Sequence, residues 1–341
     1  MTTLTAPANL AEDAAPRPVP WRRMAWVTWR QHRFALGGVA VFLGALAVYL
    51  WLSGLAMHHA YATECHSGGA PACGDFTDRY GVTAIVVSIF LQAVPALIGA
   101  FVGAPALARE METGTFRYAW TQGIGRWRWT LGKLVPLAVA VAAGAGAFSA
   151  LFSWYDQPFV AVGYAIPFST RVFDLIGVAF AAWTLAAFAI GALAGVLIRR
   201  VVPAIAATLA GYAGLALTTG LFLREHYLTP LATSQPDLPD SAWAVSQWYT
   251  KDGTFAFPAH GSPFTDAVMR LCNGGTSGGP GTGGGIMSPA QCLSQHGYTP
   301  WTSYQPGSRF WPFQWIEGGW LLALSVLLIA ATVWVVRRRA A

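Results

Sequence analysis

Residues 175–223 read LIGVAFAAWTLAAFAIGALAGVLIRRVVPAIAATLAGYAGLALTTGLFL, and the only charged side chains in them are the neighbouring Arg199 and Arg200. The apolar stretches on either side, 175–198 and 201–223, are each long enough to cross about 30 Å of hydrocarbon as a helix. Only a short turn joins them. We therefore predict a tight hairpin of two membrane-spanning helices.

The same pattern recurs along the whole chain. Of its 341 residues, 55% are hydrophobic and 11% charged, and the mean hydropathy is +0.45. Soluble globular domains rarely show this balance. We therefore predict an all-α integral membrane protein, because six uncharged stretches are long enough to span a bilayer. They are 34–57, 81–108, 134–155, 175–198, 201–223 and 318–336.

Basic residues beside the spans predict the orientation, because segments rich in Lys and Arg resist translocation. Most of the 21 basic residues lie on the side of the membrane that holds both termini. We therefore place the termini and the loop between the second and third spans in the cytoplasm. The net charge of +6 is then an orientation signal, and nucleic acid is not expected as a partner. These basic residues are Arg17, Arg22, Arg23, Arg30, Arg33, Arg109, Arg117, Arg126, Arg128, Lys133, Arg199, Arg200, Arg337, Arg338 and Arg339.

The chain before the first span has two parts. Residues 1–20 are rich in Ala, Pro and Thr, which predicts a disordered cytoplasmic arm. In the following PWRRMAWVTWRQHRF, four arginines gather on one side of a helical wheel and most apolar residues lie elsewhere. This pattern predicts an amphipathic helix in the membrane interface. The alternative is an ordinary basic anchor before the first span.

The segment between the last two predicted spans, residues 224–317, is far longer than a simple connection. Its place in the topology puts it outside the cell. We predict a small irregular cap with short helices, inserted in a transmembrane domain that covers residues 21–341.

Four cysteines divide between the two longest predicted extracellular loops. Cys65 and Cys73 lie in the first, and Cys272 and Cys292 in the last. Because the outside is oxidising, we predict disulfides; three pairings are possible, and pairing within each loop is preferred. A metal site is the alternative, offered by three histidines beside the first pair, but their spacing fits no standard zinc pattern. The histidines are His58, His59 and His66.

The predicted spans offer little for catalysis or for ion coupling. Such activities usually need ionisable side chains inside the membrane, yet Asp174 and Lys133 lie only at span margins. The nearest match to a phosphate-binding loop, GRWRWTLGKL at 125–134, has six residues between its glycines instead of four, and Leu after the Lys. We therefore predict no catalytic residues, no metal and no cofactor in this chain. Its energy must come from a partner.

The predicted cytoplasmic loop AREMETGTFRYAWTQGIGRWRWTLGKL, residues 108–134, is polar and lies between two apolar stretches. Gly114 can end the helix that continues from the second span, and Thr115 can cap a short helix that reaches about Gln122. We interpret residues 108–134 as a rigid, charged elbow. The alternative is a solvated basic connector that only sets topology.

The elbow resembles that of the membrane subunits of ABC type-2 exporters, above all the stand-alone permeases common in actinobacteria. The family pattern is approximately RE-x-E-x-GT, a short helix, a basic residue and GK before the third span. The chain departs from it at AWTQG, where many relatives have an apolar residue and Pro. The matching positions are Arg109, Glu110, Glu112, Gly114, Thr115, Arg126, Gly132 and Lys133.

The resemblance implies that residues 112–122 form a coupling helix that docks on a separate cytosolic ABC ATPase, which binds ATP and Mg. It also implies that two membrane subunits pair, identical or different, with spans two and five facing the pathway. Four charged residues would pair with the ATPase, and three aromatic residues would be buried anchors. The charged residues are Glu110, Glu112, Arg117 and Arg126, and the anchors are Phe116, Tyr118 and Trp120. The residues implied in coupling are Arg109, Glu110, Glu112, Gly114, Thr115, Phe116, Arg117, Tyr118, Trp120, Arg126 and Lys133.

Polar residues of spans two and five are the candidates for the substrate pathway, although each could instead bond to a neighbouring helix. They are Gln92, Thr208, Tyr212, Thr218 and Thr219. A largely apolar route suits a hydrophobic or amphipathic substrate, such as a drug, an antibiotic or a lipid. We therefore expect an exporter permease surrounded by membrane lipids in the bacterial plasma membrane. The alternative is a membrane sensor or scaffold with a ligand-binding extracellular cap; a membrane enzyme comes third.

Overall fold

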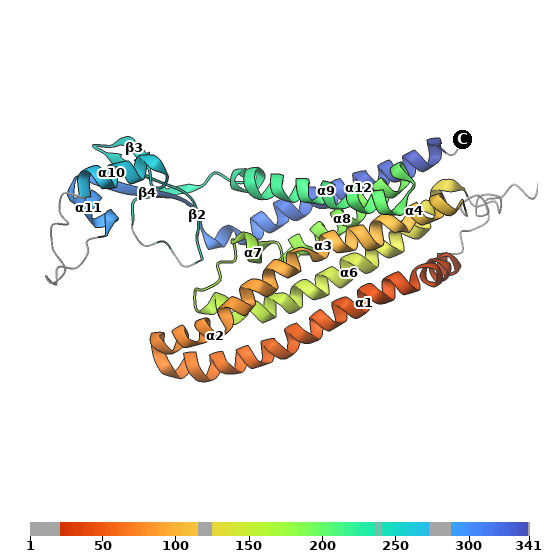
Figure 1. The fold of residues 1–341 in the computed structure, drawn as a ribbon, viewed down its shortest axis with the longest axis horizontal. Coiled ribbons are helices and arrows are strands. Elements are labelled where there is room, and N and C mark those ends of the chain that lie inside the picture. The colour runs from red at the N-terminus through yellow and green to blue at the C-terminus, as the bar shows by residue number, and fades with distance from the viewer. Residues whose placement is uncertain (1–20, 115–124, 236–237, 239–240, 273–287, 340–341) are drawn as a thin grey trace, which may run out of the picture.

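The computed structural model of the chain describes residues 21–114, 125–235, 238, 241–272 and 288–339. Long helices run along the molecule, and a small cap of strands and short helices lies at one end (Figure 1). The helices are α1 (Trp21–Ala60), α2 (His66–Gln92), α3 (Val94–Ile98), α4 (Ala104–Thr113), α6 (Arg126–Ala161), α7 (Thr170–Phe173), α8 (Gly177–Ile198), α9 (Val201–Thr218), α10 (Ser262–Cys272), α11 (Pro289–Gln295) and α12 (Phe310–Arg339). The strands are β1 (Leu231–Thr233), β2 (Trp243–Lys251), β3 (Thr254–Pro258) and β4 (Tyr298–Gln305).

Short turns of π- or 3₁₀-helix join several of these helices. Three are π-helical, η2 (Tyr61–Cys65), η3 (Gly99–Gly103) and η4 (Thr219–Leu223). Two are 3₁₀-helical, η5 (Arg224–His226) and η7 (Gly307–Arg309). As a result, the second span is a continuous run from α2 to α4, and the fifth continues from α9 through η5.

Six segments of the described chain are long and apolar enough to cross a membrane. Each overlaps one predicted span, which confirms the all-α membrane fold. Several extend well past the predicted ends, because helical hydrogen bonding continues through the charged residues at which those ends were set. The segments are Gly37–Cys65, Cys73–Thr113, Arg126–Ala161, Gly177–Ile198, Val201–His226 and Gly307–Arg338.

The helix α8 is the centre of the bundle. It contacts α3, α4, α6, α9 and α12, and most of its side chains are buried. Half of its 22 residues are Gly or Ala, so neighbouring backbones can approach it on several sides. A helix that is apolar all round is suited to such a buried position.

Glycines of the second span and of α8 interlock. A Cβ added at Gly99 would lie 2.5 Å from the carbonyl oxygen of Ala187, and one at Gly191 would meet the backbone of Gly99 and Gly103. At Gly195 it would lie 2.5 Å from the carbonyl oxygen of Ala104. The two small-x-x-x-small patterns therefore pack against each other, so no larger side chain fits without separating the helices.

The hairpin of α8 and α9 forms as predicted. Arg199 ends α8 with a left-handed backbone (φ 58°), and its amide donates to the carbonyl oxygen of Gly195 at 3.0 Å. The next helix begins at Val201. The reversal is therefore completed within Arg199 and Arg200.

The first two spans are joined differently from the predicted loop. The backbone stays helical from α1 through η2 into α2, so Cys65 and Cys73 lie in a helical hairpin and are bonded to each other, with their Cα atoms 4.9 Å apart. His58 Nε2 donates to the Trp154 carbonyl oxygen at 2.9 Å. Among the described residues, no three His, Cys, Asp or Glu side chains gather as a metal site.

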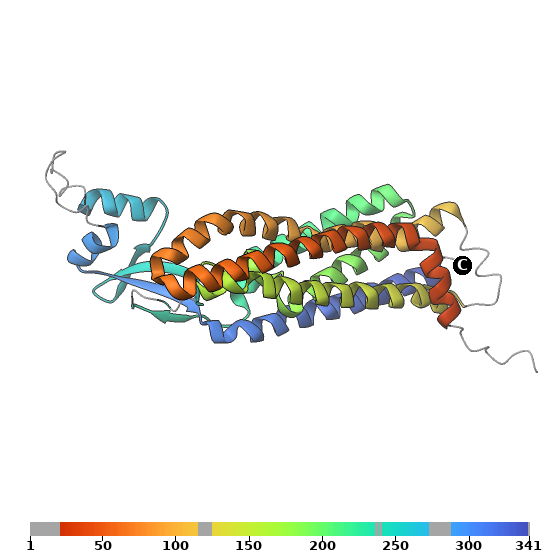
Figure 2. The same cartoon turned by 90° about the horizontal axis from the view of Figure 1, so that it is seen from below.

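The N-terminal end of α1 bends across the end of the bundle (Figure 2). A bend there suits a helix that lies along a membrane surface before the chain enters the bilayer. The side chains of residues 21–36 and the whole arm 1–20 lie outside the described part of the chain. The amphipathic pattern and the disordered arm therefore stay predictions.

The cap differs from the irregular structure that we predicted. Its four strands form one antiparallel sheet in the order β1-β4-β2-β3. The strands are rich in Trp, Tyr, Thr and Phe, which favour extended backbone. Beside the sheet, α10 packs on a small core that contains Tyr249, Phe257 and Leu293. The prediction of short helices was right, but the sheet was missed.

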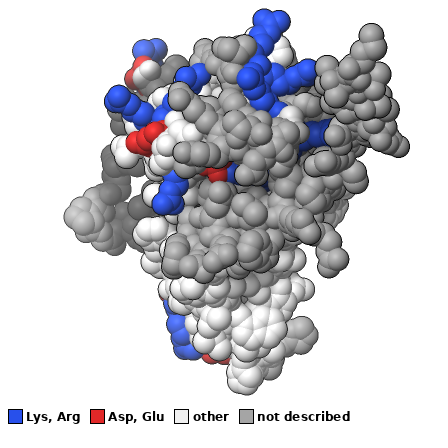
Figure 3. Space-filling view, turned by 90° about the vertical axis from the view of Figure 1, so that its right-hand side faces the viewer, with Lys and Arg blue, Asp and Glu red and all other residues white. Residues whose placement is uncertain are grey.

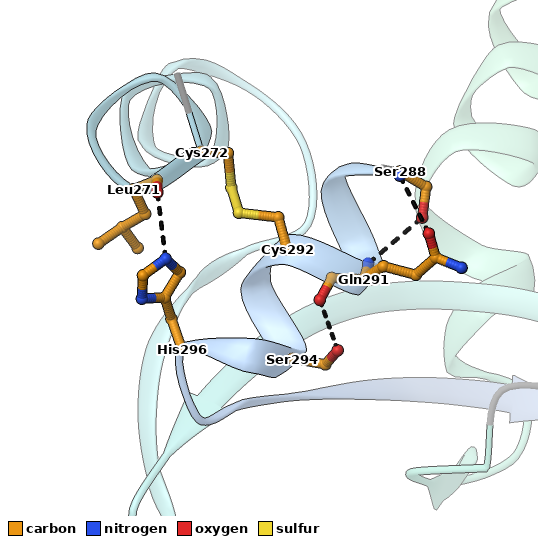
Figure 4. The surroundings of a disulfide bond; sticks show 7 residues. All are labelled: Leu271, Cys272, Ser288, Gln291, Cys292, Ser294 and His296. Carbon is orange, nitrogen blue, oxygen red and sulfur yellow. Dashed lines mark hydrogen bonds between the residues drawn. A yellow bond between two sulfur atoms is a disulfide. The ribbon is translucent and has the colours of Figure 1, made fainter. Parts of the chain in front are cut away.

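A disulfide fastens α10 to α11 (Figure 4). Cys272 and Cys292 are bonded, with their Cα atoms 6.0 Å apart. Next to them, His296 Nε2 donates to the Leu271 carbonyl oxygen at 3.1 Å. Both cysteine pairs of the structure are therefore the preferred pairs within one loop.

The glycine contact gives a testable prediction. Gly191→Val should destabilise the protein by roughly 1–3 kcal/mol, because its Cβ meets backbone that cannot move aside. Gly146→Val is the matched control, since a Cβ there meets nothing within 4 Å. Thermal unfolding of the detergent-solubilised proteins would compare them. Equal losses in the two variants would contradict the interlocking role.

Candidate functional site

The two described ends of the elbow are joined by a buried ion pair. Lys133 Nζ, from α6, donates to Glu110 Oε1, from α4. Both residues are buried, and the ammonium nitrogen of Lys133 also lies 4.7 Å from the centre of the Trp129 ring. The pair fixes the end of the second span against the start of the third.

The elbow is also attached to the start of the fifth span. Glu112 Oε2 accepts a hydrogen bond of 3.1 Å from the amide of Val201, the first residue of α9. The first amides of a helix lack partners within it and carry partial positive charge, so a carboxylate stabilises this end. The bond therefore links the end of α4 to α9.

Helix α4 ends as the sequence predicted. Gly114 has a left-handed backbone (φ 70°), which is the conformation that glycine adopts most readily after a helix. Arg109 is exposed and Arg126 is half-buried. The predicted coupling residues Thr115, Phe116, Arg117, Tyr118 and Trp120 lie outside the described part of the chain.

The end of the molecule that carries the elbow is basic. Figure 3 views the molecule from this end, where Lys and Arg outnumber Asp and Glu among the coloured side chains. The C-terminal end of α12 and the first residues of α1 lie at the same end (Figure 1). The exposed cations of α4, of the turn between α8 and α9 and of the end of α12 are Arg109, Arg199, Arg200, Arg337 and Arg338.

A cavity of about 130 Å³ lies between the second span, α8 and α9. Two predicted pathway residues, Gln92 and Tyr212, line it from the second and fifth spans. Asp174, Phe180 and Trp183 complete much of its wall. Spans two and five therefore meet at a common space.

A family model described as ABC-2 membrane transporter related matches residues 40–224. This range covers more than half of the chain.

The chain belongs to this ABC-2 family.

Membership confirms the resemblance that the elbow indicated. It makes the chain a multi-pass protein of the bacterial plasma membrane and the membrane subunit of an ABC transporter, a class that works with an ATPase subunit. The matched range covers nearly all of the first five spans, the elbow and the cavity, whereas the cap sheet and α12 lie beyond it. No curated protein matches the chain.

The three threonines that were predicted to line the pathway of this ABC-2 protein bond to their own helix. Thr208, Thr218 and Thr219 each donate to the carbonyl oxygen four residues earlier, at 2.7, 2.7 and 2.9 Å. Gln92 differs, because its Nε2 donates to the Thr170 carbonyl oxygen at 2.9 Å, from the segment before α8. Of the five candidates, Gln92 and Tyr212 line the cavity between the second span, α8 and α9, and the three threonines are not among its lining residues.

A buried cluster of charges that the sequence did not predict lies next to this cavity. Arg224 Nη2 donates to Asp174 Oδ1, and it donates to Glu317 Oε1 at 2.7 Å. Arg224 Nε donates to Glu317 Oε2 at 3.0 Å, and the Tyr227 hydroxyl donates to the same oxygen at 3.2 Å. Burial, with the nearby charge of Glu317, raises the pKa of Tyr227, so this hydroxyl keeps its proton.

These buried ionisable residues lie just beyond the ends of the predicted spans. Arg224 and Glu317 are the first charged residues beyond the predicted ends of spans five and six, and both lie within helical segments that are long and apolar enough to cross a membrane. Asp156 is likewise buried within the third segment. The sequence did contain a signal for this pair, because Arg224 follows the fifth predicted span and Glu317 precedes the sixth, on the same side of the membrane.

The buried pair of the elbow gives a second prediction. Lys133→Met leaves Glu110 buried without its counter-charge, which should cost roughly 3–5 kcal/mol of stability. The double variant Glu110→Leu/Lys133→Met should recover most of this loss, because an apolar pair can replace a buried ion pair. Unfolding in detergent measures both, with Arg109→Met as the exposed control. A double variant less stable than Lys133→Met would refute this account of the pair.

Proposed function

We propose that the chain is the permease subunit of an ATP-driven exporter for hydrophobic or amphipathic substrates. Two permeases and two cytosolic ATPase subunits would form the transporter. The basic elbow would lie in the cytoplasm, where cationic segments are retained, and the cap would lie outside. ATP and Mg would be bound by the ATPase.

The observation that carries this proposal is the connection of the elbow to both spans that line the cavity. The second span runs directly into the elbow. The fifth is attached to it through the bond between Glu112 and Val201. A displacement of the elbow by the ATPase would therefore reach Gln92 and Tyr212, one on each of these spans.

The interlocked glycines support the same mechanism. Because the backbones of the second span and α8 are in direct contact, these helices would move as one body. Both cavity-lining spans also contain a π-helical turn, η3 after Gln92 and η4 after Tyr212. Such turns are frequent at functional sites in helices, and they offer places where each span can bend.

The role of the elbow residues follows from their burial. Glu110 and Lys133 would position the elbow, since they are buried and bonded to each other. The exposed Arg109 and Glu112 would be accessible to the ATPase. The family membership favours transport over the sensor alternative.

Coupling can be tested by co-expression with a candidate ABC ATPase subunit. Glu112→Lys should lower the permease-stimulated ATP hydrolysis about tenfold, the effect that about 1.4 kcal/mol of lost interaction produces. It removes the helix contact to Val201 and inverts an exposed charge. Copurification of the two proteins is measured in parallel.

Glu225→Lys is the matched control, because it makes the same charge change at the opposite end of the fifth span. It should leave stimulation and copurification unchanged. Thermal unfolding of both variants separates lost coupling from lost folding. Unaltered stimulation by a folded Glu112→Lys variant would show that the elbow does not engage the ATPase through this residue.

A further inference from the structure

We propose that the cavity between the second span, α8 and α9 binds the positively charged end of an amphipathic organic cation. Asp174 would supply the counter-charge, and Phe180, Trp183 and Tyr212 would supply the aromatic walls. The inference rests on the proposed function, because it names the class of substrate for the same route.

The aromatic walls suit a cation. The rings of Trp183 and Tyr212 have their centres 5.7 Å apart and lie nearly perpendicular, at 78°. Two such rings can present a face and an edge to the same space. Ring faces attract organic cations, Trp most strongly, and aromatic cages of this kind recognise quaternary ammonium groups.

The charges around the cavity also favour a cation. Among the described residues that line the cavity, Asp174 is the one that carries a formal charge. Its side chain is 25% exposed, whereas those of Arg224 and Glu317 are 3% and 0% exposed. The cluster holds two carboxyl groups and one guanidinium, so with both carboxyls ionised it has an excess negative charge that opens on the cavity through Asp174.

Glu317 has more hydrogen-bond donors around it than Asp174 has. Glu317 accepts from Arg224, from the Tyr227 hydroxyl and from Trp183 Nε1, the last at 2.8 Å. Asp174 shares the same Arg224 through one of its oxygens. Arg224 itself does not line the cavity, although its buried Nη1 has no partner among the described residues. An anion in the cavity would therefore face a carboxyl group.

The size of the cavity limits what it holds. Its volume of about 130 Å³ is well below the roughly 300–1,000 Å³ of pockets that enclose a whole drug-sized ligand. It would accept a compact charged group, and the apolar remainder of the molecule would lie outside it. Gln92 adds a polar wall, since its amide oxygen can accept a hydrogen bond from an ammonium group.

Protonation of Asp174 should control this binding. Burial raises the pKa of its carboxyl to about 7; the Arg224 guanidinium opposes this rise, and the negative charge of Glu317 adds to it. Tyr212 is the further titratable group that faces Asp174, from α9. A bound cation favours the ionised carboxyl, so its affinity should fall as the pH drops from about 8 to about 6.

Phenyltrimethylammonium is a suitable probe, because it carries a permanent charge and its own charge does not change with pH. Binding to the full chain in lipid nanodiscs is measured by equilibrium dialysis, with empty nanodiscs as the blank. The control ligand is tert-butylbenzene, which has the same shape with carbon in place of the charged nitrogen. We expect saturable binding of the cation and none of its neutral analogue. Equal binding of the two would overturn the proposal.

Two variants test the residues. Asp174→Asn should weaken binding of phenyltrimethylammonium at least about tenfold and abolish its pH dependence, since a single charge contact is removed. Tyr212→Leu removes an aromatic wall and leaves the charge cluster intact, so it should weaken binding at both pH values. It also keeps the test decisive if Asp174→Asn fails to fold.

Asp156→Asn is the matched control, because Asp156 is a buried carboxyl group that lines a different, smaller cavity. It should bind the cation as the unaltered protein does. Loss of binding in this control equal to that in Asp174→Asn, or normal binding by folded Asp174→Asn and Tyr212→Leu, would sink the assignment. If the ATPase is still stimulated through the elbow but no cation binds, this inference fails and the proposed function stands.

Discussion

The close contact between the second span and α8 is the constraint on which the rest of the structure depends. Inside a bilayer the hydrophobic effect does not drive helices together, so their association relies on the fit of one surface to another. Here Gly99, Gly103, Gly191 and Gly195 let two backbones touch. The second span is thereby held against the central helix between the elbow at one end and the cavity near the other.

Polar contacts at both ends extend this unit to its neighbours. At the elbow, Lys133 links the third span to Glu110 of α4, and Val201 links the fifth span to Glu112 of α4. At the end near the cap, Arg224 draws together the segment before α8, the fifth span and α12. The middle of the bundle is held mainly by packing, and its ends by charge. Polar groups therefore lie at the ends of the bundle, where water or a partner can form hydrogen bonds or ion pairs with them.

Local patterns sufficed to predict part of this arrangement. The six spans could be predicted from long uncharged stretches, and the end of α4 from Gly114. Both features depend only on residues that are neighbours in the sequence. The cluster around Arg224 could not be read in this way, since its partners lie 50 and 93 residues away in the sequence. The cap sheet was hidden for the same reason, as β2 and β4 pair across α10 and α11. The cavity could not be predicted either, because its walls come from three helices whose relative positions the sequence does not give.

The position of Arg224 in the chain bears on how the protein is made. Synthesis proceeds from the N-terminus, so Asp174 is in place before Arg224 emerges, whereas Glu317 follows much later. Asp174 can neutralise the guanidinium while the cap and the last helix are still being translated. Glu317 then completes the cluster, and the last helix inserts against a bundle that already holds its counter-charge.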